Sequence, residues 1–180
     1  DNYDSFTYNL VHYLEDLGAK VEVMFNDKID VALLEKADGV VLSPGPGLPN
    51  ESGDLLTTIA SIKNKKPIFG VCLGMQALCE SEGGTLKNLR KVFHGVEGTI
   101  RIDADSALYK GIAVPISVGR YHSWVVDEVP DCFQVDSKDG EGNAMSMTHK
   151  TLPIWAVQYH PESILTPNGK QILANWITTL

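Results

Sequence analysis

The chain has 180 residues, of which 43% are hydrophobic and 21% are charged, and its formal net charge is −8. A chain of this length is expected to form one domain, residues 1–180, with a sizeable core. The negative charge argues against a partner that is a nucleic acid or an anionic membrane, because both require a basic surface. No apolar stretch predicts a transmembrane helix, and none predicts a signal peptide.

The cysteine content indicates a reducing compartment. Cys72, Cys79 and Cys132 form no Cys-x-x-Cys pair and cannot all be bridged. We therefore expect a cytoplasmic protein with free thiols. The cysteines and histidines lack the spacing of metal ligands, so no metal site is predicted.

The first half of the chain alternates helical and strand patterns. Apolar residues at helical spacing predict a helix over 6–17, with Asp4 or Ser5 as its N-cap. Strands are predicted at 20–25, 39–43 and 67–71, and further helices at 31–37, 51–66 and 73–83. The second and third of these strands are continuously apolar, as in parallel strands that are buried on both faces. This alternation predicts βαβ units and an open, mostly parallel sheet flanked by helices, the α/β class.

The second half consists mainly of short β-rich segments. They lie at 91–104, 116–126, 132–139 and 143–150, and they predict a small antiparallel side sheet. A last strand with a polar exit is predicted at 153–163, and a closing helix at 168–180. No repeat or linker interrupts the chain.

Residues 70–74, Gly-Val-Cys-Leu-Gly, fit the pattern G-x-C-x-G of a nucleophile elbow. In such an elbow, Cys72 would sit on a sharp strand-to-helix turn, and the flanking glycines would remove Cβ clashes. The helix N-terminus would lower the pKa of the thiol, and the N–H of Leu73 would point toward a developing oxyanion. A buried cysteine in an ordinary βα turn fits the five residues equally well.

His160 is the best candidate for a catalytic base because it ends a predicted strand and is followed by Pro161 and Glu162. Residues i and i+2 of an extended segment project to the same side, so Glu162 could orient His160. A structural histidine in a turn is the alternative. Catalysis is favoured because Cys72 and His160 both follow predicted parallel strands, at the sheet edge where ligands bind.

The loop Ser-Pro-Gly-Pro-Gly at 43–47 also follows a predicted parallel strand. Gly45 and Gly47, interleaved with Pro44 and Pro46, could supply a second oxyanion donor and hold a small polar substrate. The loop lacks the Lys and Ser/Thr of a phosphate-binding loop. Taken alone, it fits a structural turn better.

The motifs occur together in one order, SPGPG, GVCLGMQA and QYHPES, and with them the chain resembles the triad, or class I, glutamine amidotransferases from end to end. The opening DNYDSFTYN, the RYHS at 120–123 and the HPESILT at 160–166 are similar to the glutaminase components of anthranilate synthase and aminodeoxychorismate (p-aminobenzoate) synthase. The resemblance implies a flavodoxin-like architecture.

The resemblance also implies residue roles. Cys72 would attack the side-chain amide of L-glutamine, His160 would act as base and then as acid, and Glu162 would orient His160. The implied substrate-binding residues, which include the oxyanion donors Leu73 and Gly45, are Gly45, Pro46, Gly47, Leu73, Gln76, Ser123 and Trp124. A glutamyl thioester would be hydrolysed to glutamate.

The implied partner is a synthase subunit that receives the ammonia and aminates chorismate, in tryptophan or folate biosynthesis. Its active site would choose between the two products and would hold the Mg²⁺, so no cofactor is expected in this chain. Family members begin with a short apolar strand that pairs near the middle of the sheet, and we therefore expect a first β-strand ahead of Asp1.

Two other functions fit parts of the pattern. A stand-alone γ-glutamyl hydrolase or cysteine peptidase would use the same fold and nucleophile, but the opening segment and RYHS count against it. A non-catalytic binding module would keep the fold with a silent site, and the intact set of Cys72, His160 and Glu162 counts against that.

Overall fold

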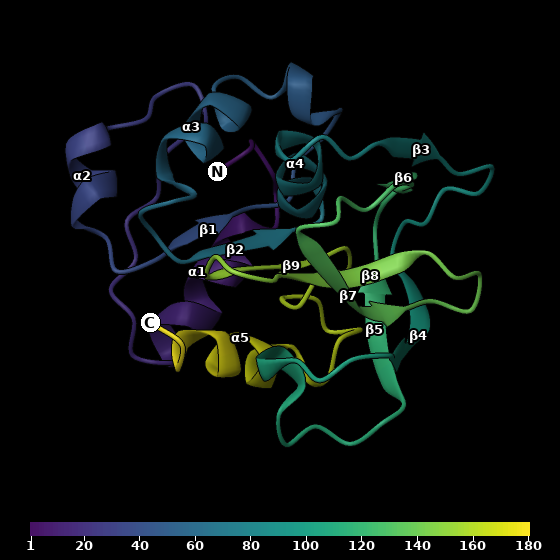
Figure 1. Ribbon diagram of the computed structural model, residues 1–180. Helices are drawn as coiled ribbons and strands as arrows, with labels where there is room; N and C mark the ends of the chain where they lie inside the picture. The colour runs from purple at the N-terminus through teal and green to yellow at the C-terminus, as the bar shows by residue number, and fades with distance from the viewer.

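The computed structural model describes residues 1–180 (Figure 1). The helices are α1 (Thr7–Asp16), α2 (Val31–Lys36), α3 (Leu55–Ile62), α4 (Leu73–Ser81) and α5 (Gly169–Ile177). The strands are β1 (Val40–Leu42), β2 (Ile68–Val71), β3 (Leu86–Asn88), β4 (Val96–Ile102), β5 (Ile116–Arg120), β6 (Trp124–Val126), β7 (Phe133–Lys138), β8 (Ala144–His149) and β9 (Ile154–Val157). None of the helices combines the length and the apolar character needed to cross a membrane.

Seven strands form one sheet in the order β1-β2-β9-β8-β7-β4-β5, and β3 pairs with β6 in a separate antiparallel sheet. The neighbours β1, β2 and β9 are parallel, whereas β8, β7, β4 and β5 continue the sheet in antiparallel fashion. The predicted α/β class is confirmed, with an open sheet, flanking helices and a small additional antiparallel sheet. The segments predicted to form that side sheet mostly extend the main sheet instead, as β4, β5, β7 and β8, and only β6 belongs to the small one.

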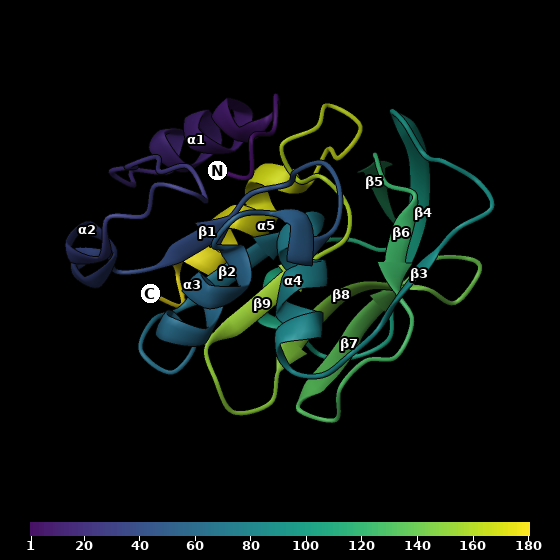
Figure 2. The same cartoon turned by 90° about the horizontal axis from the view of Figure 1, so that it is seen from above.

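Helices cover both faces of the sheet (Figures 1 and 2), with α3 and α4 on one face and α1 and α5 on the other. Successive residues of β2 alternate between the two cores. Ile68 belongs to the buried cluster beneath α3 and α4, while Phe69 and Val71 belong to the cluster beneath α1 and α5. This double burial explains the continuous apolar run of β2, because neither face of the strand meets water.

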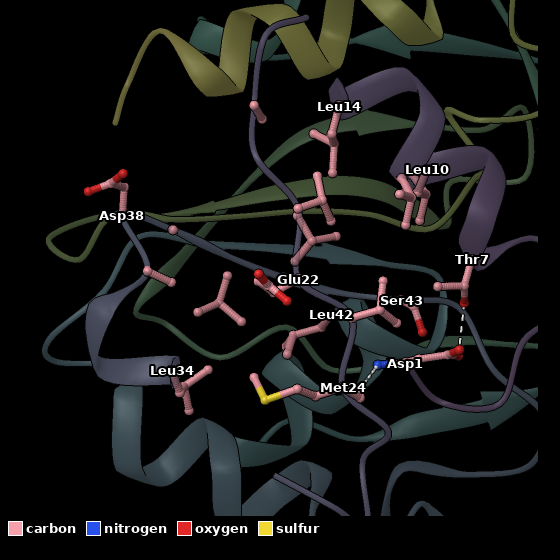
Figure 3. A pocket seen from close by; sticks show the side chains of 18 of the residues that line it. Asp1, Thr7, Leu10, Leu14, Glu22, Met24, Leu34, Asp38, Leu42 and Ser43 are labelled. Atoms are coloured by element: carbon pink, nitrogen blue, oxygen red, sulfur yellow. Dashed lines mark hydrogen bonds between the residues drawn. The ribbon is translucent and has the colours of Figure 1, made fainter. Parts of the chain in front are cut away.

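The prediction of a strand at 20–25 is wrong, because these residues pair with no other strand. β1 is an edge strand of the sheet, and residues 20–25 do not pair with its free outer edge. A hollow of about 880 Å³ is lined by residues of both the 20–25 segment and β1 (Figure 3). At its rim the N-terminal ammonium of Asp1 donates to the carbonyl of Met24 at 2.5 Å (Figure 3). The strand expected ahead of Asp1 stays a prediction.

Two helix boundaries also differ from the prediction. The helix α1 begins at Thr7 after Phe6, which has no side-chain cap. The Asp4 carboxylate accepts from the N–H of Phe6 at 2.8 Å, two residues ahead of the N-cap position. The predicted helix at 51–66 is split into a short 3₁₀ turn, Pro49–Glu51, and α3. Gly53, with φ of +53°, lies between them and interrupts the helical backbone.

Candidate active site

Cys72 lies on a strained turn between β2 and α4. Its φ of 51° and ψ of −101° lie in a region that residues with a Cβ atom rarely adopt. The predicted strand-to-helix elbow is therefore confirmed. Cys72 is the N-cap residue of α4, and the first N–H groups of this helix have no intrahelical acceptor.

The glycines of the elbow are required by close packing. A Cβ atom on Gly74 would lie 2.5 Å from the carbonyl oxygen of Leu42, and one on Gly70 would lie 2.7 Å from Leu78 Cδ1. Only glycines let the first turn of α4 press against β1 and β2 at these positions. This packing holds the α4 N-terminus against the ends of both strands.

Three strand ends meet at the site. The parallel register pairs Leu42 of β1 with Gly70 of β2, and Val71 of β2 with Val157 of β9. The loop after β1, the elbow after β2 and the segment after β9 consequently emerge side by side at one sheet edge. The prediction that Cys72 and His160 share the carboxyl edge of the parallel strands is confirmed.

His160 and Glu162 form a buried pair. His160 Nδ1 and Glu162 Oε1 are 2.6 Å apart, and their side chains are 4% and 0% exposed. The backbone of His160 is held by its N–H, which donates to Gly119 at 3.0 Å, and by its carbonyl, which accepts from the Thr166 hydroxyl at 2.6 Å. The imidazole therefore has little freedom to rotate.

The second nitrogen of His160, Nε2, is buried and has no well-formed hydrogen bond. The Cys72 side chain is close enough to interact with His160. Burial alone would lower the pKa of His160, but the interactions with Cys72 and Glu162 outweigh burial and raise the pKa to about 10. The geometry thus favours an imidazolium between the sulfur and a carboxylate. Catalytic hydrogen bonds of this kind often tighten only when substrate is bound.

Aromatic rings pack around His160. The Tyr121 ring lies 4.8 Å from the His160 ring, and Phe6 lies 5.4 Å from Tyr121. The Tyr121 hydroxyl is 3.1 Å from Ser163 Oγ, which ties the ring to the segment after β9. Phe6 of the opening segment and Tyr121 of the RYHS motif therefore pack beside His160, a role that no pattern in either segment predicted.

The loop at 43–47 packs against the elbow. A Cβ atom on Gly45 would lie 2.7 Å from Leu73 Cδ2 and 2.6 Å from the Asn2 Cβ, so only glycine fits there. Asn2 binds Ser43 twice at 2.8 Å, through its N–H to the hydroxyl and its side-chain amide to the carbonyl. The N–H of Gly45 donates to no protein acceptor. A free donor thus lies close to the start of α4.

Two side-chain amides lie beside Cys72. Gln76 Nε2 donates to the Trp124 carbonyl at 3.0 Å and to Gln158 Oε1 at 3.2 Å, and Gln158 Nε2 lies 3.5 Å from Cys72 Sγ. Trp124 therefore contacts Gln76 through its backbone carbonyl. Gln158 was not among the predicted site residues, although a glutamine within an apolar strand run was a usable signal.

The remaining predicted binding residues are Pro46, Gly47 and Ser123. Pro46 and Gly47 are exposed in the loop after β1, and Ser123 is half-buried next to Trp124. None of them has a hydrogen bond to Cys72, His160 or Glu162 in the structure. Their place in a substrate pocket stays a prediction.

Arg120, the first residue of the RYHS motif, fixes the motif through contacts with three neighbouring side chains. Its guanidinium lies 2.9 Å from Asp139 and stacks 3.6 Å from the Phe93 ring. The Arg120 Nε–H donates to His122 Nε2 at 3.3 Å, and His122 Nδ1 faces the Trp124 carbonyl at 3.1 Å. His122 is thereby fixed as the neutral Nδ1–H tautomer. Burial, and then the charge of Arg120, lower its pKa to about 4.

The comparisons with known proteins identify one family over nearly the whole chain. The family model described as glutamine amidotransferase class-I matches residues 1–180. Component 2 of the aminodeoxychorismate/anthranilate synthase of Bacillus subtilis is 43% identical, with 99% of this chain and 94% of the relative covered. Anthranilate synthase component 2 of Pseudomonas aeruginosa is 44% identical over 98% of this chain and 92% of the relative.

A third relative is aminodeoxychorismate synthase component 2 of Escherichia coli, which is 41% identical over 98% of this chain and 96% of its own length. Among solved structures, a Thermoplasma acidophilum protein described as one of the subunits of a GMP synthase superposes with a TM-score of 0.89 at 28% identity. The superposition covers 99% of this chain and 89% of that one.

Proposed function

Because the chain belongs to the class-I glutamine amidotransferase family, we propose that it takes ammonia from L-glutamine with Cys72, His160 and Glu162 as its catalytic triad. The chain is a glutamine amidotransferase component of anthranilate or aminodeoxychorismate synthase. One observation carries the assignment of the triad. A cysteine on a strained elbow shares a sheet edge with a buried histidine that is bound by a carboxylate at 2.6 Å.

The first half of the proposed reaction forms a thioester. The Cys72 thiolate attacks the side-chain carbonyl carbon of glutamine, and the carbonyl π-electrons move onto oxygen. The N–H groups of Leu73 and Gly45 stabilise this oxyanion. When the oxyanion collapses, the C–N bond breaks, and the leaving nitrogen takes the proton from His160 Nε2 and departs as ammonia. Glu162 holds the Nδ1–H throughout.

The second half regenerates the enzyme. Neutral His160 accepts a proton from water, whose oxygen attacks the thioester carbonyl. The second tetrahedral intermediate collapses, the C–S bond breaks, and glutamate leaves. The thiolate of Cys72 and the imidazolium of His160 are restored, which is the charge state that the raised pKa of His160 favours. The reaction uses only protein groups and water, so the proposal assigns the Mg²⁺ of the complex to the synthase.

The proposed partner is a chorismate-aminating synthase subunit. The relatives named as component 2 of anthranilate and aminodeoxychorismate synthases support this assignment. In the proposed complex, ammonia passes to that subunit, whose active site decides between anthranilate and p-aminobenzoate. The proposed location is the cytoplasm, and the three free cysteines of the structure suit a reducing compartment.

Covalent labelling tests the proposal. The protein is incubated with an electrophilic glutamine analogue, with and without a chorismate-aminating synthase subunit, and the adduct is located by peptide mass spectrometry. We expect an adduct on Cys72, blocked by glutamine, with none on Cys79 or Cys132, which serve as internal controls. Burial raises the pKa of the Cys79 thiol to about 12, so Cys79 should not react.

The outcomes separate the candidate functions. Labelling of Cys72 that glutamine blocks and that the synthase partner accelerates supports a partnered amidotransferase. Labelling that no synthase influences, together with hydrolysis of γ-glutamyl peptides, would instead indicate a stand-alone hydrolase. Absence of an adduct on Cys72 in both conditions would reject the triad.

A further inference from the structure

Gln158 is a buried polar residue that the proposed reaction has not yet used. It follows β9 within the run Ile-Trp-Ala-Val-Gln-Tyr, and its exposed fraction is 0%. A buried amide is costly unless its donors and acceptor are paired. The hydrogen-bond partners of Gln158 therefore indicate its role.

The register of the sheet places Gln158 beside the nucleophile. Val157 of β9 pairs with Val71 of β2, so the next residues, Gln158 and Cys72, lie next to each other. The Cys72 N–H donates to the Val157 carbonyl at 2.8 Å, and the Gln158 N–H donates to Met145 at 2.9 Å. Both backbones are thus tied down, and Gln158 Nε2 reaches Cys72 Sγ at 3.5 Å.

A chain of hydrogen bonds determines which end of the Gln158 amide faces the sulfur. The Trp124 backbone carbonyl can only accept, so the Gln76 group that meets it at 3.0 Å is the NH₂. The same NH₂ lies 3.2 Å from Gln158, which must present its carbonyl oxygen there. The NH₂ of Gln158 is therefore the end directed at Cys72.

We propose that Gln158 is a further catalytic residue, whose amide N–H donates to the Cys72 sulfur and holds it as a thiolate in the position for attack. The inference rests on the proposed function, because it assumes that Cys72 is the nucleophile. A donor directed at sulfur stabilises the anion relative to the thiol. The same hydrogen bond limits rotation of the Cys72 side chain about its Cα–Cβ bond. The sulfur is thereby kept in the position for attack.

Gln158 and His160 then act on the sulfur together. His160 supplies the mobile proton that leaves with ammonia, whereas Gln158 supplies a proton that never transfers and stabilises charge only. Gln76 takes a positioning role toward Gln158, in addition to any contact with glutamine. Both donors of its NH₂ are used within the protein, and its carbonyl oxygen is the atom that has no protein partner in the structure.

The test measures the protonation of Cys72 directly. The rate of alkylation of Cys72 by iodoacetamide is followed from low to high pH by peptide mass spectrometry in the full-length wild type, Gln158→Met and Gln158→Glu. Methionine keeps the length of the side chain and removes the donor. Glutamate keeps an acceptor for Gln76 but presents a carboxyl group to the sulfur. Gln171→Met, at an exposed position of α5, is the matched control.

We expect the pH midpoint of alkylation to rise by about one unit in Gln158→Met and by at least as much in Gln158→Glu. The acid limb of the pH profile of kcat/KM should move with it. The kcat for glutamine hydrolysis should fall about tenfold or more, with KM changed less than about threefold. Gln171→Met should match the wild type in all three readouts.

A purely structural role predicts a different result. If the folded variants keep the alkylation midpoint within about 0.2 pH unit of the wild type, the proposal is overturned, whatever their thermal stability. If both variants fail to fold, the role is structural and the proposal is likewise overturned. Failure of wild-type Cys72 to react with the glutamine analogue would instead reject the triad, so the two failures are distinguishable.

Discussion

Glu162 Oε1 lies 2.6 Å from His160 Nδ1, although only Pro161 separates the two residues in the sequence. The proposed base and the carboxylate proposed to orient it therefore come from one short segment. This segment is buttressed by α5, because a Cβ atom on Gly169 would collide with the Pro161 carbonyl. The pair is local, but its place beside Cys72 depends on the pairing of β9 with β2.

Replacement of the nucleophile should separate two activities. Cys72→Ala should abolish glutamine-dependent synthesis by the complex, because no thioester can form, while synthesis from added ammonium salt continues at the wild-type rate. Both rates are measured on the reconstituted complex with chorismate. Cys132→Ala serves as the control variant and should leave both rates unchanged. Equal loss of the two activities in Cys72→Ala would contradict the proposed division of labour.

The carboxylate of the triad should affect kcat more than KM. In Glu162→Gln the side-chain amide can direct its NH₂ toward His160 Nδ1, which favours the wrong tautomer and removes the negative charge that stabilises the imidazolium. We expect kcat for glutamine hydrolysis to fall by about 10²-fold or more. Glutaminase kinetics provide the measurement, and Glu97→Gln on the exposed part of β4 is the control. A loss below about threefold would show that Glu162 does not orient His160.

The buried His122 should make stability depend on pH. Its pKa is lowered to about 4, so between pH 6.5 and 4 the unfolded chain binds a proton that the folded chain does not. This contribution to stability is therefore present above pH 6.5 and is lost as the pH falls toward 4. For this group alone, the free energy of unfolding should drop by about 2 kcal/mol between pH 7.5 and pH 5.

Urea denaturation of the wild type and of His122→Gln at both pH values isolates this contribution, because glutamine does not titrate. The wild type should lose about 2 kcal/mol more than the variant on acidification. Parallel loss in both proteins would mean that His122 is not held neutral by Arg120 and the Trp124 carbonyl.

The elbow glycines give a stability prediction with a matched control. In Gly74→Ala the new methyl group would lie 2.5 Å from the Leu42 carbonyl oxygen, so α4 must move away from β1. We expect a loss of about 2 kcal/mol or more in the free energy of unfolding. Gly140→Ala meets nothing within 4 Å and should change stability by less than about 0.5 kcal/mol. Thermal denaturation compares them, and equal stability of the two variants would contradict the packing argument.

Contiguous motifs predicted the parts of the site that are built locally. The elbow at 70–74 is encoded by glycines on either side of Cys72, and the His160–Glu162 pair by an extended segment with one residue between the two. The apolar runs of β1 and β2 predicted buried parallel strands, and the rule that ligands bind at the carboxyl edge of such strands placed both candidates together. These predictions hold because each depends on steric and periodic constraints over a few residues.

The sequence analysis erred or was silent where a local structure depends on residues that are distant in the chain. Residues 20–25 carry a strand pattern, but a local pattern does not reveal whether the segment pairs with the free edge of β1, and in the structure it does not. The contact between Arg120 and Asp139 joins the end of β5 to the residue after β7, which no local periodicity indicates. The same limit hid Gln158, which becomes a neighbour of Cys72 only through the register of β2 and β9.

The sequence by itself predicted the fold class and the family, and it singled out the residues that we propose as nucleophile, base and carboxylate, because steric demands and residue chemistry are written in short contiguous segments. Only the tertiary structure decided which amides surround the sulfur, which ring packs on His160 and which tautomer His122 adopts. These properties depend on distances between residues far apart in the chain, and such distances exist only once the strands have paired and the two cores have formed.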